Sequence, residues 1–358
     1  MEIRELDRAS IEAYLEFCKG IYKDNPYYRD SMSSVLRDIL KGKAQICKSS
    51  MLVPVMAIEG EKILAVCIFA IVDRMGDTLQ MAYFEALPHQ EKAVEALIHH
   101  GKKLAKHQGI HQILIGLNLH VNYGLGLLAS EFNQRPSFGT AYNPPYYIDY
   151  LQSMANEEIG LVSYLAKMEN FDFGMKDRWI EKMTAKYNVR KADFKKLKRD
   201  AAIYTDLNNR AFKKHRFYYA RKEAEDLELF SEFKLLLREE NLLFLEHEGE
   251  PIGFMLWYPD YNELIKPGET LGLKTLIKNR IYGHRIQRFK IVELGVLPEF
   301  QKKGAVFTLF YKLRQMLGER YKECESGWIL EDNLSSRGLC YRWAEREYKQ
   351  YKVFLLYL

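Results

Sequence analysis

The stretch from Lys290 to Phe307 has residue types that could hold a phosphorylated ligand. An apolar run from Ile291 to Leu297 is followed by a polar segment, and a helical pattern begins after Gly304 and runs from Ala305 to Leu317. The first N–H groups of a helix have no partner within it, so together with the helix dipole they attract anions. A glycine lets the backbone approach a bulky anion closely. Further donors and positive charge come from Gln301, Lys302 and Lys303. We expect a pyrophosphate site, although a plain strand-to-helix turn has the same residue types.

The composition is that of an ordinary globular protein. The 358 residues are 47% hydrophobic and 28% charged, and this length favours two domains over one. Residues Met1 to Ser10 are too polar for a signal peptide, and the longest apolar run, Ile63 to Val72, is far too short to span a bilayer. The sequence therefore predicts a cytoplasmic protein without a membrane partner.

The cysteines and histidines do not predict a metal site. The five cysteines are odd in number and widely scattered, and no two of them form a C-x-x-C pair. The nine histidines have no spacing that is typical of metal ligands. We expect reduced cysteines and no bound metal.

Two basic segments without acidic residues interrupt an otherwise balanced charge pattern. They run from Arg210 to Lys222 and from Lys274 to Lys290, and both contain aromatic residues. Such segments could serve nucleic acid, acidic lipid or a phosphorylated cofactor. A solvated basic face is the simpler interpretation, and we do not expect a nucleic-acid partner.

The chain contains a weak internal repeat. Each half begins with a short strand and a helix, continues with an acid-Gly hairpin, and later has a Leu-Pro pair before a helix and an apolar run ending in Asn. The paired landmarks are Met1–Asp7 with Tyr187–Asp193, Gly60 with Gly249, Leu87-Pro88 with Leu297-Pro298, and Asn118 with Asn333. Their offset increases along the chain, which places an insertion in the basic stretch before Lys290. We expect two copies of one α/β domain.

The division that this repeat predicts is 1–168 for the first domain, 169–188 for a connecting helix and 189–358 for the second domain. At the place of Gly304 and its neighbours, the first copy has Pro88 to Ala93, which has no glycine and carries Glu91 at the helix start. A phosphate would be repelled there, so only the second copy is expected to bind an anion.

Several motifs resemble the GNAT superfamily of acyl-CoA-dependent N-acyltransferases, and more closely a two-domain bacterial branch of it. They are Pro298-x-x-Gln301-x-x-Gly304, W-I-L-E-D-N at 328–333, Y-N-P-P-Y-Y at 142–147 and G-F-M-L-W-Y-P-D-Y-N-E at 253–263. The resemblance covers nearly the whole chain. It implies an α/β fold of tandem GNAT-like domains, each a mixed, mostly antiparallel central sheet flanked by helices, with Trp328 to Asn333 as the companion strand of Ile291 to Leu297.

The resemblance also implies a place for acetyl-CoA or another acyl-CoA. The backbone of Gln301, Lys302, Lys303, Gly304, Ala305 and Val306 would hold the pyrophosphate, although the superfamily usually has Gly or Ala at the place of Val306. Val296 and Leu297 would offer backbone groups to the pantetheine arm and the thioester carbonyl. Asn333 would face the pantetheine amides.

Proton transfer and acceptor binding have weaker candidates. Glu293 lies on the motif strand and is the first candidate base, on the face opposite to Val296 by strand alternation. Tyr341 is the candidate acid, one position after Cys340, where many superfamily members have their tyrosine. Asp260 and Asn262 could bind a substrate amine. Solvent-exposed or packing roles explain Glu293 and Tyr341 as well, and a proline-initiated turn explains the last two.

Three functions are compatible with these residues. The first is an N-acyltransferase that moves an acetyl group from acetyl-CoA to an amine. The second is a non-catalytic acyl-CoA-binding protein. The third is an aminoacyl-tRNA-dependent transferase of similar tandem fold, against which the intact segment Gln301 to Gly304 argues, because such enzymes use no CoA.

Overall fold

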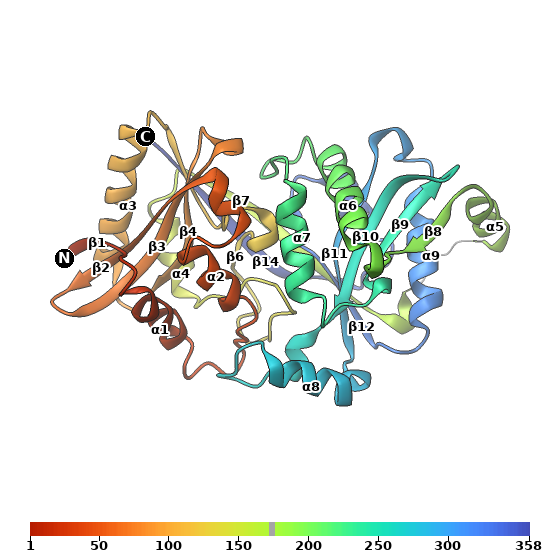
Figure 1. Ribbon diagram of the computed structural model, residues 1–358, viewed down its shortest axis with the longest axis horizontal. Helices are drawn as coiled ribbons and strands as arrows, with labels where there is room; N and C mark the ends of the chain where they lie inside the picture. The colour runs from red at the N-terminus through yellow and green to blue at the C-terminus, as the bar shows by residue number, and fades with distance from the viewer. Residues whose placement is uncertain (172–175) are drawn as a thin grey trace. The chain divides into compact units, whose positions relative to one another are not determined.

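The described chain, residues 1–171 and 176–358 of a computed structural model, divides into two units (Figure 1). The first unit comprises Met1–Val162, Ile265–Leu271 and Lys349–Leu358, and the second comprises Ser163–Leu264 and Gly272–Tyr348. The strands of each unit follow one another in the sheet order, and each such run is described below as the sheet of that unit.

The sheet of the first unit is antiparallel apart from the parallel pair β4 and β5. Its order is β1 (Glu2–Glu5), β2 (Ser50–Glu59), β3 (Lys62–Val72), β4 (Leu79–Ala86), β5 (Gln112–Ile115) and the last residues of β14 (Arg346–Tyr357), with β6 (Leu127–Leu128) also pairing with β14. Its helices are α1 (Ile11–Ile21), α2 (Ser33–Leu40), α3 (Glu91–His107) and α4 (Tyr146–Gln152). The apolar side of α3 packs on β2 to β5 and forms the core of this unit.

The sheet of the second unit has the same plan. Its order is β8 (Asn188–Lys191), β9 (Leu242–His247), β10 (Glu250–Pro259), β11 (Arg288–Val296), β12 (Glu323–Ser326) and the last residues of β7 (Glu157–Lys167), with β13 (Ile329–Leu330) also pairing with β7. Only β11 and β12 pair in parallel among these neighbours. The helices are α5 (Asp177–Lys186), α6 (Leu197–Ala211), α7 (Glu223–Phe233), α8 (Leu273–Tyr282), α9 (Ala305–Leu317) and α10 (Leu334–Cys340).

One hydrogen bond recurs at the same place in both units. The Leu87 N–H donates to the Leu64 carbonyl at 2.9 Å, and the Leu297 N–H donates to the Ile252 carbonyl at 2.9 Å. Both bonds join the end of the fourth strand of the unit to the third. The repeat that the sequence predicts is thus a repeat of fold, and the tandem α/β architecture with mixed, mostly antiparallel sheets is confirmed.

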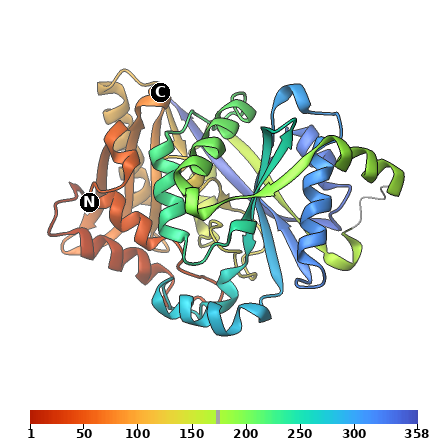
Figure 2. The same ribbon diagram turned by 45° about the vertical axis from the view of Figure 1, so that its right-hand side comes forward.

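Helices cover both faces of the second sheet. α6 packs on β10 and β11, and α7 packs on α6. Figure 2 shows α5 beside α9, which packs on β8, β9 and β10. Phe254 contacts Tyr204 of α6, and the register pairs Phe254 with Gly295 and Leu256 with Glu293. Glu293 therefore faces α6, and strand alternation directs the side chain of Val296 to the other face, as the sequence indicates.

The units differ from the predicted division at both ends. Residues 163–167 of β7 belong to the second unit, where 165–167 pair with β12, and the last residues of β14 pair with β5 in the first. In the predicted connecting helix, Met168–Asn170 form a 3-10 turn and α5 begins at Asp177, while residues 172–175 lie outside the described chain. The predicted companion strand was misplaced, because β12 ends at Ser326 and only Ile329–Leu330 of the W-I-L-E-D-N segment are extended in a sheet.

No helix within residues 1–171 and 176–358 is long and apolar enough to cross a bilayer.

Candidate active site

Strands β11 and β12 separate part of the way along β11. Their parallel register runs from Arg288 to Ile291, where the Gly327 N–H donates to the Ile291 carbonyl at 2.6 Å. On its other side, β11 has a bulge at Val292, because Glu293 pairs with Leu256 and Ile291 with the next residue, Trp257. The bulge turns the strand, and β11 continues to Val296 beyond its pairing with β12.

The backbone polar groups of Val296 lie on the side of β11 where β12 no longer pairs with it. Since the Leu297 N–H bonds to β10, alternation directs the N–H and carbonyl groups of Val296 away from β10. The carbonyl accepts a hydrogen bond from Nε2 of Gln301 at 2.8 Å. The N–H of Val296 therefore points into the opening between the two strands, whereas the Leu297 N–H is held in the sheet.

The loop from Gln301 to Gly304 closes onto the start of α9. Lys302 and Gly304 both adopt left-handed backbone conformations, with φ of 58° and 82°, and Gly304 is the residue before the first turn of α9. By helix geometry, the N–H groups of Ala305 and Val306 have no acceptor within the helix. The exposed Lys302 and Lys303 add positive charge. This loop has the donors and the charge that a pyrophosphate requires.

A side chain of α5 lies against the same loop. A Cβ atom on Gly304 would lie 2.8 Å from Cη2 of Trp179 and 2.9 Å from Sδ of Met183. The Trp179 ring also packs edge-on against Phe307 of α9, with centroids 5.7 Å apart. The glycine is therefore required by its left-handed φ and by the closeness of the indole.

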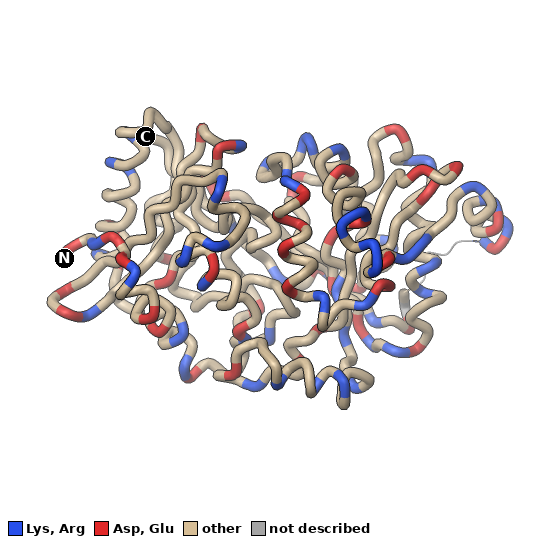
Figure 3. The backbone as a smooth tube through the Cα atoms, in the orientation of Figure 1, with Lys and Arg blue, Asp and Glu red and all other residues tan. Residues whose placement is uncertain are grey.

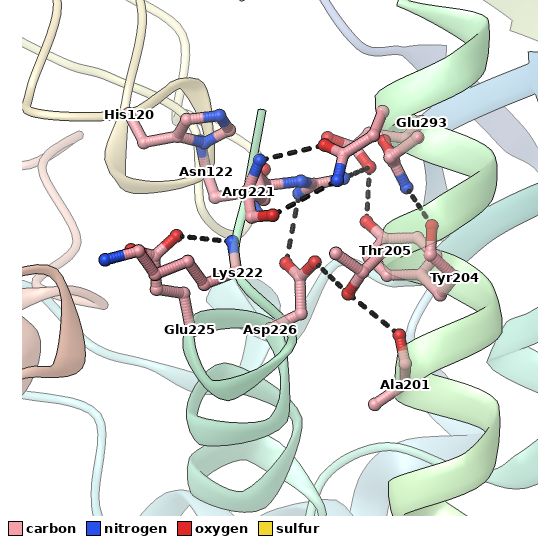
Figure 4. Close-up of polar contacts among 12 residues, drawn as sticks. His120, Asn122, Ala201, Tyr204, Thr205, Arg221, Lys222, Glu225, Asp226 and Glu293 are labelled. Atoms are coloured by element: carbon pink, nitrogen blue, oxygen red, sulfur yellow. Dashed lines mark hydrogen bonds and ion pairs between the residues drawn. The ribbon is translucent and has the colours of Figure 1, made fainter. Parts of the chain in front are cut away.

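Glu293 belongs to a buried ion-pair cluster (Figure 4). Arg221 lies 3.4 Å from Oε2 of Glu293 and 3.2 Å from Oδ1 of Asp226, measured from its two Nη atoms. The Tyr204 hydroxyl donates to Glu293, and the Thr205 hydroxyl donates to Asp226 at 2.7 Å. The side chains of Arg221 and Asp226 are each 1% exposed, against 16% for Glu293. Glu293 is thus the carboxylate of the cluster that solvent and a ligand can reach.

The two carboxylates differ in their environment. Burial raises the pKa of Asp226 to about 6, although the Arg221 guanidinium and the Thr205 hydroxyl act in the opposite direction. Breaking such a buried pair by removing one partner costs about 3–5 kcal/mol, because the other charge stays behind.

His215 is a second titratable group near the opening. It follows α6, and its ring lies 6.0 Å from that of Trp328, just after the end of β12. The Phe217 N–H donates to Nδ1 at 3.3 Å, so the ring proton lies on Nε2 in the neutral form. Burial lowers the pKa of His215, while Asp332 and Glu293 act weakly against this shift. A neutral imidazole can accept a proton.

The candidate acid Tyr341 lies away from β11. It is 57% exposed, and its hydroxyl donates to Glu347 at 2.6 Å and accepts from Arg337 at 2.9 Å. Its neighbour Cys340 is buried, which raises the pKa of the thiol to about 12. The structure does not bring Tyr341 to Glu293, and its role as an acid stays a prediction.

The remaining predicted residues have local hydrogen bonds. Asn333 caps α10, since its Oδ1 accepts from the Ser336 N–H at 3.1 Å. Oδ1 of Asp260 accepts from the Asn262 N–H at 3.2 Å, which is the Asx turn that a proline-initiated loop favours. Asp260 and Asn262 are both buried.

In the first unit, tyrosines of α4 cover the equivalent strand end. The Tyr147 hydroxyl accepts from the Ala86 N–H at 2.7 Å, and the Tyr146 hydroxyl donates to the Ala86 carbonyl at 2.9 Å. The Tyr150 hydroxyl accepts from the Gln90 N–H at the start of α3 at 3.1 Å. Ala86 has the place of Val296 in the repeat, so the N–H group that the second unit leaves open is bonded internally here.

Sequence reasoning missed four residues of this region: Trp179, Tyr204, Arg221 and His215. Arg221 and His215 lie in the basic segment from Arg210 to Lys222, where an interleaved Phe-Tyr-Tyr was the available signal of burial. Trp179 belongs to an apolar stripe that sequence alone assigns to packing. Within residues 1–171 and 176–358, no group of His, Cys, Asp and Glu side chains gathers as metal ligands do.

Residues 203–343 match the family model described as acetyltransferase (GNAT) family. The match runs from within α6 to just after α10 and contains the whole loop.

Two curated proteins are similar to the chain. Protein YghO of Escherichia coli (strain K12) is 21% identical over 259 residues, which are 70% of this chain and 66% of YghO. The bacterial ceramide synthase of Caulobacter vibrioides (strain NA1000 / CB15N) is 23% identical over 249 residues, which are 66% of this chain and 64% of that protein. Both alignments span just under two thirds of the relative's length.

Solved structures show the tandem fold over the whole chain. A tandem GNAT protein from the clavulanic acid biosynthesis pathway has a TM-score of 0.58 at 12% identity, covering 99% of this chain and 98% of its own. A GCN5-related N-acetyltransferase from Sphaerobacter thermophilus has a TM-score of 0.51 at 14% identity, covering 99% and 95%. At this identity the likeness shows the fold alone.

Proposed function

We propose that the chain is an acyl-CoA-dependent N-acyltransferase whose second unit performs the reaction. The observation that carries the proposal is the opening between β11 and β12, with the Val296 N–H directed into it and the Gly304 loop at the start of α9. A long thioester ligand needs both features, an anion site for its pyrophosphate and a strand edge for its arm.

The loop and the strand would bind different parts of the donor. The N–H groups of Ala305 and Val306, with Lys302 and Lys303, would hold the pyrophosphate. The Val296 N–H would donate to the thioester carbonyl oxygen, where negative charge develops during attack. Leu297 contributes less, because its N–H is bonded to Ile252. Removing one such donor typically costs about 10²–10³ in rate.

The reaction itself is a simple exchange of bonds. The neutral amine nitrogen attacks the thioester carbon, a C–N bond forms, and the C–S bond breaks with its electron pair leaving on sulfur. A base must take one proton from the amine. Glu293 is the candidate on β11, and His215 is the alternative on the loop after α6. Tyr341 remains the candidate proton donor to the leaving thiolate.

The acceptor can be sought among amines of different size. Ceramide is an amide of a fatty acid and a long-chain amino alcohol, so the name of the Caulobacter relative implies N-acylation of a lipid amine. The panel should therefore include polyamines, amino sugars, amino acids and a long-chain amino alcohol. Acetyl-CoA is the first donor to test, followed by acyl-CoAs of increasing chain length.

The test is the release of free CoA thiol in the presence of an acyl-CoA and each amine. Turnover that is lost in Glu293→Gln or His215→Gln supports the proposal. A ligand present at 100 times its Kd stabilises the folded state by about 2.7 kcal/mol, so a rise in melting temperature with acyl-CoA reports binding.

The same measurements separate the other functions. A rise in melting temperature without turnover for any amine favours a non-catalytic acyl-CoA-binding protein. That alternative has one observation in its favour, which is that Glu293 already pairs with Arg221. If acyl-CoA has no effect and aminoacyl-tRNA supports transfer, the CoA-dependent proposal is wrong.

A further inference from the structure

Helix α8 presents branched apolar side chains to solvent. Leu273 is 73% exposed, and Ile277 and Ile281 are each 53% exposed. These positions are four residues apart, so they form one line along the helix. Tyr282, the last residue of α8, is turned away from this line and is 43% exposed.

The opposite side of α8 is polar and faces the protein. Thr275 is buried, and Nζ of Lys278 donates to the Leu264 carbonyl at 3.0 Å. Helices on the surface of a globular domain have the reverse arrangement, with apolar residues inward and polar residues outward. The exposed line of α8 is therefore not explained by packing within the second unit.

Basic side chains flank the exposed line. Lys274, Arg280 and Arg285 are exposed, and within the described residues none of them pairs with a carboxylate. Figure 3 shows basic residues along α8 without acidic ones on the helix. The other basic residues of this segment serve the fold, as Arg288 does by pairing with Glu323 at 2.7 Å.

The repeat shows that the fold does not require α8. In the first unit, residues 73–78 connect β3 to β4, whereas residues 260–287 connect the equivalent β10 to β11. The same sheet is closed by a short turn in one unit and by an inserted helix in the other. The insertion has kept an apolar outer side, which indicates a partner.

The chemistry of α8 favours an anionic lipid surface over the other partners. A bilayer offers acyl chains to apolar residues and negative headgroups to basic residues on one plane, which is what an interfacial helix requires. A second copy of the chain would place Lys274, Arg280 and Arg285 against like charges. RNA binds through its phosphates and through stacking on aromatic rings, and α8 offers one such ring, Tyr282, against three exposed aliphatic side chains.

We propose that α8 docks the protein peripherally on an anionic bilayer, with Leu273, Ile277 and Ile281 entering the interface and the three basic residues contacting headgroups. The expectation of no membrane partner rested on the lack of a spanning segment, and a surface helix needs no such segment. The proposal is independent of acyl transfer.

The test is co-sedimentation of the full chain with vesicles of phosphatidylcholine alone and with phosphatidylglycerol added. We expect strong binding only to the anionic vesicles, weakened by salt. The double variant Ile277→Ser/Ile281→Ser should lower the partition coefficient by at least about tenfold. The matched control is Leu235→Ser, which removes a side chain that is 71% exposed elsewhere in the second unit and should leave binding unchanged.

Several results would overturn the proposal. One is that the native protein does not bind anionic vesicles. Another is that the double variant binds them as strongly as the native protein and has the same melting temperature. If the double variant instead loses self-association by light scattering and not vesicle binding, a second copy covers α8. Loss of RNA retention with vesicle binding intact would assign the helix to nucleic acid.

Discussion

The ring of Trp179 lies where a side chain on residue 304 would have to be. A Cβ on Gly304 would be 2.8 Å from Cη2 of the indole, and the backbone there has a φ of 82°. Gly304 thus adopts the left-handed backbone of the turn before α9 and leaves room for the side chains of α5. An anion at this loop would lie beside the indole ring.

Gly304→Ala should therefore impair acyl-CoA binding more than strain alone explains. A left-handed alanine costs about 1–2 kcal/mol wherever it occurs. The matched control is Gly249→Ala, whose φ is 83° and whose Cβ would meet nothing within 4 Å. We expect both variants to lower the melting temperature, and only Gly304→Ala to lose the further shift on addition of acyl-CoA. Equal ligand-induced shifts in the two variants would place the cofactor elsewhere.

Trp179 should report ligand binding by its fluorescence. Trp179 is exposed and its ring packs edge-on against Phe307, so a pyrophosphate at the loop changes its surroundings. We expect CoA to change the emission of the native protein, and Trp179→Phe to abolish that change while calorimetry still detects binding. If Trp179→Phe keeps the full change of the native protein, the signal comes from another of the four tryptophans and Trp179 does not lie beside the bound ligand.

Local signals predicted the elements of the fold well. The helix at Ala305–Leu317 has the predicted bounds, and the helix of the first unit begins at Glu91 as predicted, because apolar periodicity and a preceding Pro mark both helices clearly. The hairpin turns at Gly60 and Gly249 were predicted equally well, because an acid-Gly pair between apolar runs is typical of a hairpin. Strand β12 was missed because its sequence, Glu-Cys-Glu-Ser, is polar. The buried Glu325 lies 3.5 Å from Arg288 and accepts from the Ser163 hydroxyl at 3.4 Å, contacts that sequence alone does not show.

The site was predicted only where it is local in sequence. The Gly304 loop is one continuous segment, so residue types alone indicate its chemistry. The ion pair of Glu293 with Arg221 joins distant segments that only the packing of α6 and α7 brings together. The strand order of the two units could likewise not be predicted from the sequence, since β7 and β14 each contribute residues to both units.

Glu293→Gln distinguishes a base from an ion-pair partner. If Glu293 accepts the proton, the variant should lose about 10²–10⁴ in kcat/KM. Asp226→Asn is the matched control, because it removes the other carboxylate of Arg221 without touching β11. We expect both variants to lower the free energy of unfolding. Only Glu293→Gln should also show the large loss in kcat/KM. Equal losses of kcat/KM would mean that both residues act by holding Arg221.

Tyr341→Phe separates the candidate acid from a solvent-exposed hydroxyl. The variant removes the donor to Glu347 on an exposed site, where the cost in stability is within about 0.5 kcal/mol. A loss of kcat with unchanged KM would support proton donation to the thiolate. Unchanged kinetics would show that the Arg337 to Glu347 cluster is structural, and would leave solvent as the proton source.

The first unit should become less stable as the pH rises, because of Glu85. Burial raises the pKa of Glu85 from 4.5 to about 8, although hydroxyls of Tyr147 and Tyr22 donate to it. The folded state thus binds this proton more tightly than the unfolded state, so its contribution is full below about pH 4.5 and is lost as the pH rises through 8. The expected loss is a few kcal/mol. Glu85→Gln stays neutral and keeps a carbonyl acceptor for Tyr22, so its free energy of unfolding should fall less with rising pH than that of the native protein, whereas the exposed control Glu59→Gln should follow the native curve. Parallel curves for all three proteins between pH 5 and pH 9, from denaturant unfolding, would show that Glu85 is charged in the folded state.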